Sequence, residues 1–268
     1  MKEFYLSLKD GKLFYKKNDF NFRRKTLVFI HGLSGSSSAW IPYEDFFSKK
    51  YNVLSFDLRG HGKSFRMKNY GDLSFDKMSE DLYALLKHEK VKKFILVSHS
   101  LGTLVAFDFI NRYKKMIEKT IFLSPDYNSS ERGSTKVLKY LFLPTKIMNY
   151  FPMIKHFGKQ VDYSFHKNSG DWNVKRMIAD ISNTGLRNFF FCTLYSCYPN
   201  YTEVLRDLKM PVLIVHGRKD SIIPVKKSEE MNKLVKNSKL VILEDADHIV
   251  VLNNFNEVSR EIEKFISC

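Results

Sequence analysis

The feature that most limits the fold is an alternation of short apolar runs with longer amphipathic segments along most of the 268-residue chain. The apolar runs have the length of buried strands, which we predict at residues 26–31, 52–56, 93–98, 120–123, 212–216 and 240–243. Helices are predicted at residues 38–48, 74–90, 102–114, 225–235 and 254–266. Apolar strands separated by helices are typical of a parallel sheet covered on both faces. The alternation therefore predicts an α/β fold.

The first predicted element is a hairpin at residues 3–17, in which apolar and aromatic residues flank Asp10-Gly11. Glycine readily adopts the positive φ of such a turn. Together with the alternation, this hairpin predicts a mostly parallel sheet with helices on both faces.

One region departs from the alternation. Between Asp126 and about residue 201 no strand pattern is present, and fourteen of the 74 residues in 127–200 are aromatic. We predict a helical insertion at 127–201, with the α/β core formed by 1–126 and 202–268. Because the insertion follows a strand whose carboxyl end should face a ligand site, we expect it to be a lid over that site. The alternative is an additional layer with no role in function.

The composition is that of a globular protein, with 44% apolar and 27% charged residues. No apolar stretch has the length of a membrane span or of a signal-peptide core. Cys192, Cys197 and Cys268 are odd in number and do not indicate a disulfide framework. We therefore expect a cytoplasmic protein with free thiols.

The formal net charge is +15, and the lysines are distributed through every segment. A basic chain can bind nucleic acid or an anionic membrane surface. Because no nucleic-acid-binding motif is present, we expect no nucleic-acid partner and interpret the charge as a general richness in lysine. A weak association with an anionic membrane surface stays open, and no oligomeric state is predicted.

The sequence Ser98-His99-Ser100-Leu101-Gly102 lies between an apolar strand and an apolar helix. A serine at such a strand-to-helix turn has an exposed hydroxyl, and the N-terminus of the following helix favours a nearby oxyanion. The flanking positions must be small, which Gly102 satisfies and Ser98 satisfies in place of the more usual glycine. We predict that Ser100 is a nucleophile. The alternative, a serine that caps the helix, explains Ser100 alone.

A nucleophilic hydroxyl needs a base, and the base needs an orienting acid. His248 follows the last predicted strand and Asp220 follows the strand at 212–216, so both are expected at the carboxyl edge of the sheet. The chain order Ser, Asp, His is the order that this strand-turn-helix arrangement uses. The competing acid is Asp126, which follows the preceding strand. We assign no catalytic role to four other histidines, namely His88 on a polar helix face, His156 and His166 in the insertion, and His99, whose side chain should point away from the nucleophile.

The glycine-rich segment 31–35 (HGLSG) follows the apolar strand residues 27–30. An acyl-transfer transition state places negative charge on the former carbonyl oxygen, which two backbone N–H groups should bind. We expect these donors from Leu33 and Leu101. A loop that is merely flexible is the alternative.

Taken together, HG after the third strand, FDLRGHGKS at 56–64, SHSLG, HGRKD and DADH resemble the α/β-hydrolase superfamily over most of the chain. The chain looks most similar to its small esterases and lipases of the monoacylglycerol-lipase and carboxylesterase type. The resemblance implies Ser100 as nucleophile, Asp220 as acid, His248 as base and Leu33 as oxyanion donor. The segment 57–62 matches a family loop that is mainly structural.

These expectations favour hydrolysis of a small-molecule carboxylic ester through an acyl-enzyme, with short- to medium-chain acyl esters or monoacylglycerol-like lipids as substrates. No metal or organic cofactor is expected. The same triad also serves C–C hydrolysis or a lyase reaction on a ketonic acid, which calls for an arginine near the nucleophile. Candidates for that arginine are Arg132, Arg176 and Arg187. A third alternative is a non-catalytic ligand-binding protein.

Within the insertion, the segment 136–155 mixes long apolar side chains with four lysines. We hypothesise that its apolar faces line an acyl pocket over Ser100, while the lysines stay solvated and favour anionic interfaces. An ordinary amphipathic helix pair that packs on the core is the alternative.

Overall fold

The computed structural model describes residues 1–131, 133–153 and 158–267. Five residues that enter the sequence predictions lie outside the described residues: Arg132, Ile154, Lys155, His156 and Cys268.

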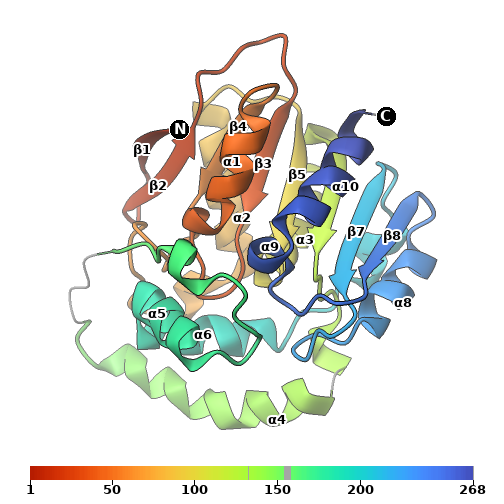
Figure 1. Ribbon diagram of the computed structural model, residues 1–268. Coiled ribbons are helices and arrows are strands. Elements are labelled where there is room, and N and C mark those ends of the chain that lie inside the picture. Colours follow the sequence, from red (N-terminus) through yellow and green to blue (C-terminus); the bar gives the residue numbers. More distant parts are fainter. Residues whose placement is uncertain (132, 154–157, 268) are drawn as a thin grey trace.

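The eight strands are β1 (Lys2–Ser7), β2 (Lys12–Lys17), β3 (Thr26–Ile30), β4 (Asn52–Phe56), β5 (Phe94–His99), β6 (Ile117–Leu123), β7 (Val212–Gly217) and β8 (Ser238–Leu243). They form one sheet in the order β1-β2-β4-β3-β5-β6-β7-β8 (Figure 1). All neighbours from β4 to β8 are parallel, whereas β2 pairs antiparallel with both β1 and β4. Strands therefore form at all six predicted positions, and the predicted hairpin is β1-β2.

Helices cover both faces of this sheet (Figure 1). One face is covered by α1 (Ile41–Phe47), α9 (Val250–Asn253) and α10 (Phe255–Ser267), and the other by α2 (Phe75–His88), α3 (Leu101–Tyr113) and α8 (Lys226–Leu234). The first predicted helix is divided, because Pro42 favours the first turn of α1 and the preceding residues form a 3₁₀ helix, η1 (Ser37–Trp40). Two further 3₁₀ helices are η2 (Tyr70–Leu73) and η3 (Lys114–Met116).

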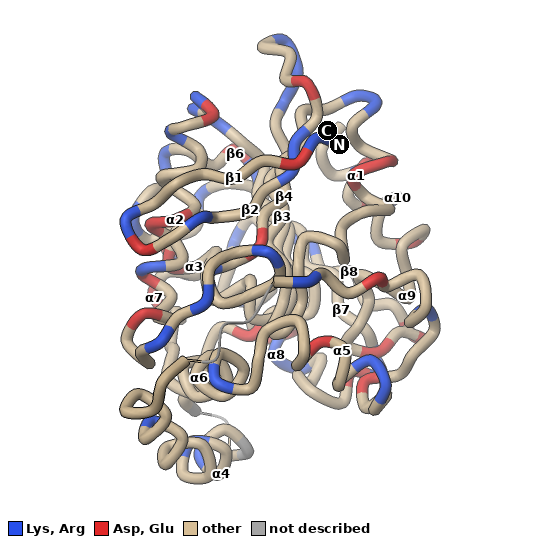
Figure 2. Tube along the Cα trace, turned by 90° about the vertical axis from the view of Figure 1, so that its left-hand side faces the viewer, with Lys and Arg blue, Asp and Glu red and all other residues tan. Residues whose placement is uncertain are grey.

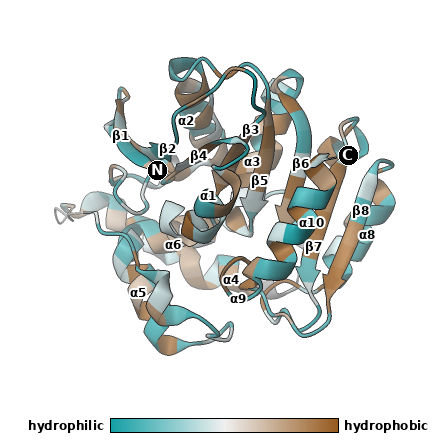
Figure 3. Cartoon of the chain, turned by 45° about the horizontal axis from the view of Figure 1, so that its top comes forward, coloured by the Kyte–Doolittle hydropathy of each residue, from teal (hydrophilic) through white to brown (hydrophobic). Residues whose placement is uncertain are grey.

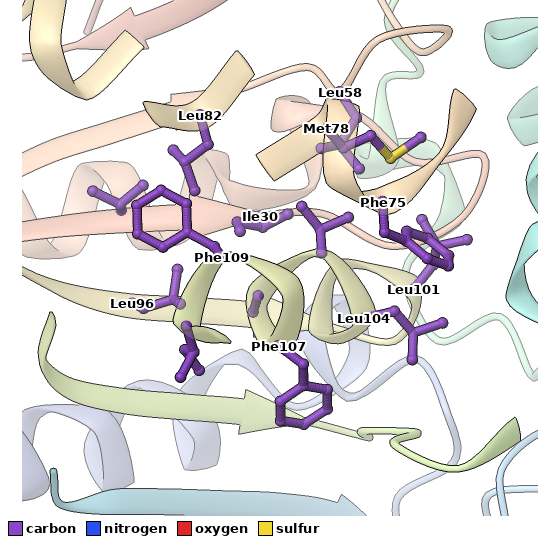
Figure 4. Packing of buried hydrophobic residues seen from close by; sticks show 14 of the residues in the cluster. Ile30, Leu58, Phe75, Met78, Leu82, Leu96, Leu101, Leu104, Phe107 and Phe109 are labelled. Atoms are coloured by element: carbon purple, nitrogen blue, oxygen red, sulfur yellow. The ribbon is translucent and has the colours of Figure 1, made fainter. Parts of the chain in front are cut away.

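Two hydrophobic cores lie on the two sides of the sheet because side chains alternate along each strand. In β3, Val28 and Ile30 belong to the core under α2 and α3, while Leu27 and Phe29 belong to the core under α1 and α10. Figure 4 shows part of the first core, where Ile30 and Leu96 of the strands face side chains of α2 and α3. The strands are thus buried on both faces, as their continuous apolar sequences predict.

The distribution of polarity agrees with this layering. In Figure 3 the strands β5 and β7 are largely hydrophobic, while α10 carries both hydrophobic and hydrophilic bands. Figure 2 shows charged residues of both signs on helices and loops around the sheet. Among the described residues, no helix is both long enough and apolar enough to cross a membrane.

The loop after β4 is braced by two buried charged residues. Asp57 accepts hydrogen bonds from the backbone N–H groups of Ser37 and Lys63, both at 2.7 Å. Arg59 binds both carboxylate oxygens of Asp81, at 2.7 Å and 2.6 Å. These contacts brace the loop, in keeping with the mainly structural role that the resemblance implies for the segment 57–62.

Between β6 and β7 the described residues form helices and no strand; the one backbone bridge there joins Asn128 and Asn200. The elements are η4 (Ser129–Glu131), α4 (Gly133–Phe142), η5 (Leu143–Tyr150), η6 (Tyr163–His166), α5 (Val174–Thr184), α6 (Leu186–Ser196) and α7 (Thr202–Arg206). Figure 1 shows α4, α5 and α6 across the edge of the sheet where the parallel strands end.

Candidate active site

Ser100 lies at the turn between β5 and α3, with φ 51° and ψ −122°. A positive φ is rare for a residue other than glycine and costs about 1–3 kcal/mol, which the surrounding structure must offset. Its neighbour Gly102 has no side chain and Ser98 is fully buried, so the first turn of α3 can approach the end of the sheet. The turn leaves the Ser100 hydroxyl at a cavity.

His248, in the loop after β8, lies beside this hydroxyl. Its Nε2 is 2.8 Å from Oγ of Ser100, and its Nδ1 is 2.7 Å from Oδ2 of Asp220. An ionised carboxylate can only accept, so Nδ1 carries the ring proton and Nε2 accepts the hydrogen bond from the serine hydroxyl. The structure thus brings the three predicted side chains into one chain of hydrogen bonds.

Asp220 is held in the loop after β7 by hydrogen bonds to both carboxylate oxygens. Oδ1 accepts from the backbone N–H groups of Ile222 and Ile223, at 2.9 Å and 2.7 Å, and Oδ2 also lies 2.9 Å from Nε2 of His216. Burial by itself raises the pKa of Asp220, but the hydrogen bonds with His216 and His248 outweigh it and hold the pKa well below the ordinary value. Asp220 is therefore a carboxylate at neutral pH.

His216 is a site residue that the sequence prediction missed. Its Nε2 lies near two acceptors, Asp220 Oδ2 and the main-chain oxygen of Ile223 at 2.9 Å, so this nitrogen carries the proton. Its Nδ1 accepts from the hydroxyl of Ser228 at 2.7 Å. The sequence did contain a signal for this role. His216 is the last residue of the strand predicted before Asp220, and the end of that strand lies at the same edge of the sheet as Asp220.

The side chain of His99, which was expected to point away from the nucleophile, instead lies beside the base His248. Its ring centroid lies 5.2 Å from that of His248, and its Nε2 is 3.0 Å from the main-chain oxygen of His248. Burial lowers the pKa of His99 to about 3, so the ring is neutral and Nε2–H donates to that oxygen. The reason is that β5 extends to His99, so alternation places it on the face of Ile95 and Val97, which α9 covers.

Asp126, the competing acid, is engaged elsewhere. Its carboxylate accepts hydrogen bonds from the backbone N–H of Asn128 at 3.3 Å and from the hydroxyl of Ser129 at 3.0 Å. These contacts organise the start of the insertion, while the carboxylate at His248 belongs to Asp220.

The glycine-rich segment 31–35 lies next to Ser100. Leu33, Ser100 and Leu101 line one cavity together, so both residues expected to supply the oxyanion donors lie at the cavity of the nucleophile. The segment is held from the insertion, because the side-chain amide of Asn183 donates to the main-chain oxygens of Ser34 and Gly35, both at 2.9 Å.

Two cavities meet at Ser100. The smaller has a volume of about 190 Å³, and its lining includes polar side chains of the insertion, among them Tyr163, Asp171, Arg176 and Asp180. The larger has a volume of about 590 Å³, and its lining includes the apolar residues Leu101, Leu104, Leu138, Ile222 and Ile223. Within the described residues, no group of three or more His, Cys, Asp or Glu side chains could hold a metal ion.

Of the candidate arginines, Arg176 reaches the smaller cavity. It is buried, and its guanidinium donates to Asp180 at 2.9 Å and to the main-chain oxygen of Asp171 at 2.7 Å. Asp180 also accepts from the hydroxyl of Tyr163 at 2.7 Å, and burial raises the pKa of Asp180 to about 6. Arg187 is instead half-buried and binds the main-chain oxygens of Phe151 and Pro152 in the insertion.

The hypothesis that the segment 136–155 lines an acyl pocket is wrong for most of its described apolar residues. Leu138 lines the larger cavity, whereas six others are more than half exposed: Val137, Tyr140, Leu141, Ile147, Tyr150 and Phe151. The reason is that α4 packs on α6, where Phe142 meets Phe190 at a ring-centroid distance of 5.5 Å, and its opposite face remains uncovered.

Two of the lysines of this segment differ from the expectation, whereas Lys136 is exposed as expected. Lys139 and Lys146 lie over the rings of Tyr198 and Tyr70, at 4.5 Å and 4.4 Å from the centroids. These two cations are therefore partly engaged with aromatic rings rather than solely with solvent.

Comparison with known proteins gives a consistent picture. The family model described as "alpha/beta hydrolase fold" matches residues 25–255. The human Protein ABHD8 is 26% identical over 252 residues, which cover 90% of this chain and 54% of that protein. A putative esterase/lipase of Haemophilus influenzae is 25% identical over 246 residues, covering 90% and 83%. The chain thus spans about half the length of the first of these relatives.

Among solved structures, the α/β-hydrolase enzyme MGS-M2 from a deep-sea metagenome library superposes with a TM-score of 0.80 at 19% identity. The match covers 98% of this chain and 97% of that one. At this identity the likeness concerns the fold.

Proposed function

The chain belongs to the α/β-hydrolase family, and from this we propose that it is a serine hydrolase that cleaves carboxylic esters through an acyl-enzyme. The observation that carries the proposal is the chain of hydrogen bonds from Ser100 through His248 to Asp220, at 2.8 Å and 2.7 Å. Nucleophile, base and orienting acid in this geometry are what acyl transfer from an ester requires.

In the proposed reaction, Ser100 Oγ attacks the acyl carbonyl carbon while His248 Nε2 takes the hydroxyl proton. Asp220 holds Nδ1–H and stabilises the imidazolium that forms. The backbone N–H groups of Leu33 and Leu101 bind the oxyanion of the tetrahedral intermediate. His248 then protonates the leaving alcohol, and a water molecule, deprotonated by His248, releases the carboxylic acid.

The two cavities support a division of the substrate. The lining of the larger one includes Leu104 and Leu138 beside polar residues, and we assign the acyl chain to it because of its larger volume. The smaller one includes Arg176 and Asp180, whose charges suit a hydroxylated alcohol. Short- to medium-chain acyl esters and monoacylglycerol-like lipids fit this division.

C–C hydrolysis or a lyase reaction on a ketonic acid is the alternative with the same triad. Arg176 is the one lysine or arginine among the described residues that line the two cavities. Because its guanidinium is already paired with Asp180, a substrate carboxylate would have to compete with that ion pair. This pairing favours a neutral ester.

A fluorophosphonate probe and two substrate assays on the wild-type protein test the proposal. We expect covalent labelling, mapped to Ser100 by mass spectrometry, together with turnover of p-nitrophenyl esters. Labelling with cleavage of a ketonic acid but no ester turnover would favour the alternative reaction. A protein that is neither labelled nor active would be a binding protein on this fold.

We also propose that the outer face of the insertion associates weakly with anionic lipid. Exposed Tyr140, Leu141 and Tyr150 lie on α4 and η5, and exposed Lys136 lies on α4. Apolar side chains with neighbouring lysines suit a lipid surface of negative charge. Co-sedimentation with phosphatidylserine vesicles, absent with phosphatidylcholine vesicles and reduced by Lys136→Glu, is the expected result.

A further inference from the structure

Asp171 lies in the insertion, between η6 and α5, and the residue is only 7% exposed. Its carboxylate accepts three hydrogen bonds. Oδ1 accepts from the backbone N–H of His248 at 2.8 Å. Oδ2 accepts from the backbone N–H and the hydroxyl of Ser221, at 2.9 Å and 2.7 Å.

These donors come from two different loops of the core. Ser221 directly follows Asp220 in the loop after β7, whereas His248 belongs to the loop after β8. One carboxylate, 50 residues from the first and 77 from the second along the chain, therefore joins the loop of the proposed acid to the loop of the proposed base.

The contact is reinforced by the next residue. The indole Nε1–H of Trp172 donates to the hydroxyl oxygen of Ser221 at 2.9 Å, while that hydroxyl donates to Asp171. Ser221 is thus held from the insertion in both its donor and its acceptor role.

The distance that this contact controls is the one between the imidazole and its acid. His248 Nδ1 and Asp220 Oδ2 are 2.7 Å apart, and their separation depends on how the two loops lie relative to each other. Hydrogen bonds to an ionised carboxylate are roughly twice as strong as neutral ones. Catalytic groups must be held to within about 0.5 Å of the productive geometry, and a misplacement of about 1 Å can cost about 100-fold in rate.

We propose that Asp171 is a positioning residue for the reaction proposed above: it acts through His248 and Asp220, and it makes the insertion a structural part of the catalytic centre. The inference rests on the proposed function, because it needs Ser100 to be activated by His248. It concerns a residue of the insertion rather than of the triad.

Two variants of Asp171 test this role. Asp171→Ala removes all three hydrogen bonds, and Asp171→Asn replaces one carboxylate oxygen by an NH₂ group that faces N–H donors. We expect kcat for p-nitrophenyl butyrate to fall about 10- to 100-fold in both, with KM changed less than about threefold. The rate of Ser100 labelling by a fluorophosphonate should fall by a similar factor, because labelling reports activation of the nucleophile.

The rate constant of Ser100 labelling separates positioning from general support of the fold. A purely structural defect reduces the fraction of protein that can be labelled, whereas a misplaced His248 lowers the labelling rate constant of every folded molecule. Asp162→Asn is the matched control, because Asp162 is an exposed residue of the same insertion whose carboxylate binds the neighbouring Ser164. This control should behave as wild type in all three measurements.

Ser221→Ala decides the question if the Asp171 variants fail to fold. It keeps the backbone N–H bond to Asp171 and loses the two hydrogen bonds of the hydroxyl, one to Asp171 and one from Trp172, so it should show a smaller fall in kcat and labelling. In folded double variants the two losses should not add, because both act on one contact.

Wild-type labelling and kcat in folded Asp171→Asn, or in Ser221→Ala where Asp171→Asn does not fold, would overturn the inference. So would a loss confined to KM. If the wild-type protein itself is not labelled, the proposed function fails instead, so the two failures are distinguishable.

Discussion

Gly102, in the first turn of α3, lies so close to His31 that a Cβ at this position would be 2.5 Å from the main-chain oxygen of His31. A Cβ would also lie 2.8 Å from the main-chain oxygen of Ile30. Both are backbone atoms of the neighbouring strand end and cannot rotate away. The absence of a side chain therefore sets how closely the helix behind Ser100 approaches β3.

Gly102→Ala should accordingly destabilise the protein, although alanine favours a helix by about 1 kcal/mol over glycine. We expect the clash to outweigh that gain and to lower the free energy of unfolding by about 1–3 kcal/mol. Because the shift moves Ser100, ester turnover should fall as well. Urea denaturation measures the first effect, and Gly71→Ala is the control, since a Cβ there meets nothing within 4 Å. Equal stability of the Gly102→Ala variant and wild type would contradict the argument.

Ser100→Ala tests the nucleophile. We expect ester turnover to fall by about three to six orders of magnitude, because the triad acts as a unit and only oxyanion and binding effects remain. The variant should stay folded by circular dichroism, since it loses one hydroxyl at a turn. Retention of more than about a tenth of wild-type kcat/KM would show that another group is the nucleophile.

Two aspartates compete for the role of the acid. Asp220→Asn should lower kcat by several orders of magnitude, because an amide that donates to Nδ1 favours the wrong tautomer of His248. Asp126→Asn should have a mild effect, because its carboxylate binds Asn128 and Ser129 instead. Steady-state kinetics of both variants give the ranking, and the reverse ranking would move the acid to the end of β6.

The lowered pKa of Asp220 predicts how stability depends on pH. A carboxyl whose folded pKa lies below its unfolded value of about 4 stabilises the fold fully above about pH 4, and this contribution is lost as the pH falls through the folded pKa. The difference in free energy of unfolding between wild type and Asp220→Asn should therefore be larger at pH 7 than at pH 3. Urea denaturation at both pH values measures it. A difference independent of pH would show that the charge of Asp220 does not stabilise the fold.

The positions of the strands and of the three triad candidates could be predicted because they follow local patterns. Buried parallel strands are continuous apolar runs, and the residues just after them meet at one edge of the sheet. Ser100, Asp220 and His248 each stand directly after such a run or in the loop that follows it. They meet in the structure because the loops that follow parallel strands lie at the same edge of the sheet.

Other features of the site depend on contacts without a local pattern. Asp171 reaches Ser221 and His248 across 50 and 77 residues, and no periodicity marks an insertion residue as a partner of two core loops. The position of His99 followed from one further residue in β5, which sequence reasoning placed outside the strand. Helix α4 shows that an amphipathic pattern identifies apolar faces without saying which of them is covered.

The length of the acyl chain is the last property that the structure lets us predict. If the acyl chain of the substrate enters the larger cavity, burial of each added methylene contributes up to about 0.8 kcal/mol to the binding free energy. kcat/KM should then rise about tenfold or more from p-nitrophenyl acetate to octanoate. Leu138 and Leu141 provide a matched pair on α4, since the first lines this cavity and the second is 66% exposed.

Leu138→Trp should fill part of the cavity and lower the octanoate-to-acetate ratio of kcat/KM by about tenfold, while turnover of acetate is retained. Leu141→Trp adds the same side chain to the exposed face and should leave the ratio unchanged. A ratio that falls equally in both variants would mean that α4 acts through its packing on α6 rather than through the cavity. In the wild-type protein, a flat or falling trend from acetate to octanoate would exclude the larger cavity as the acyl site and favour a small, polar substrate.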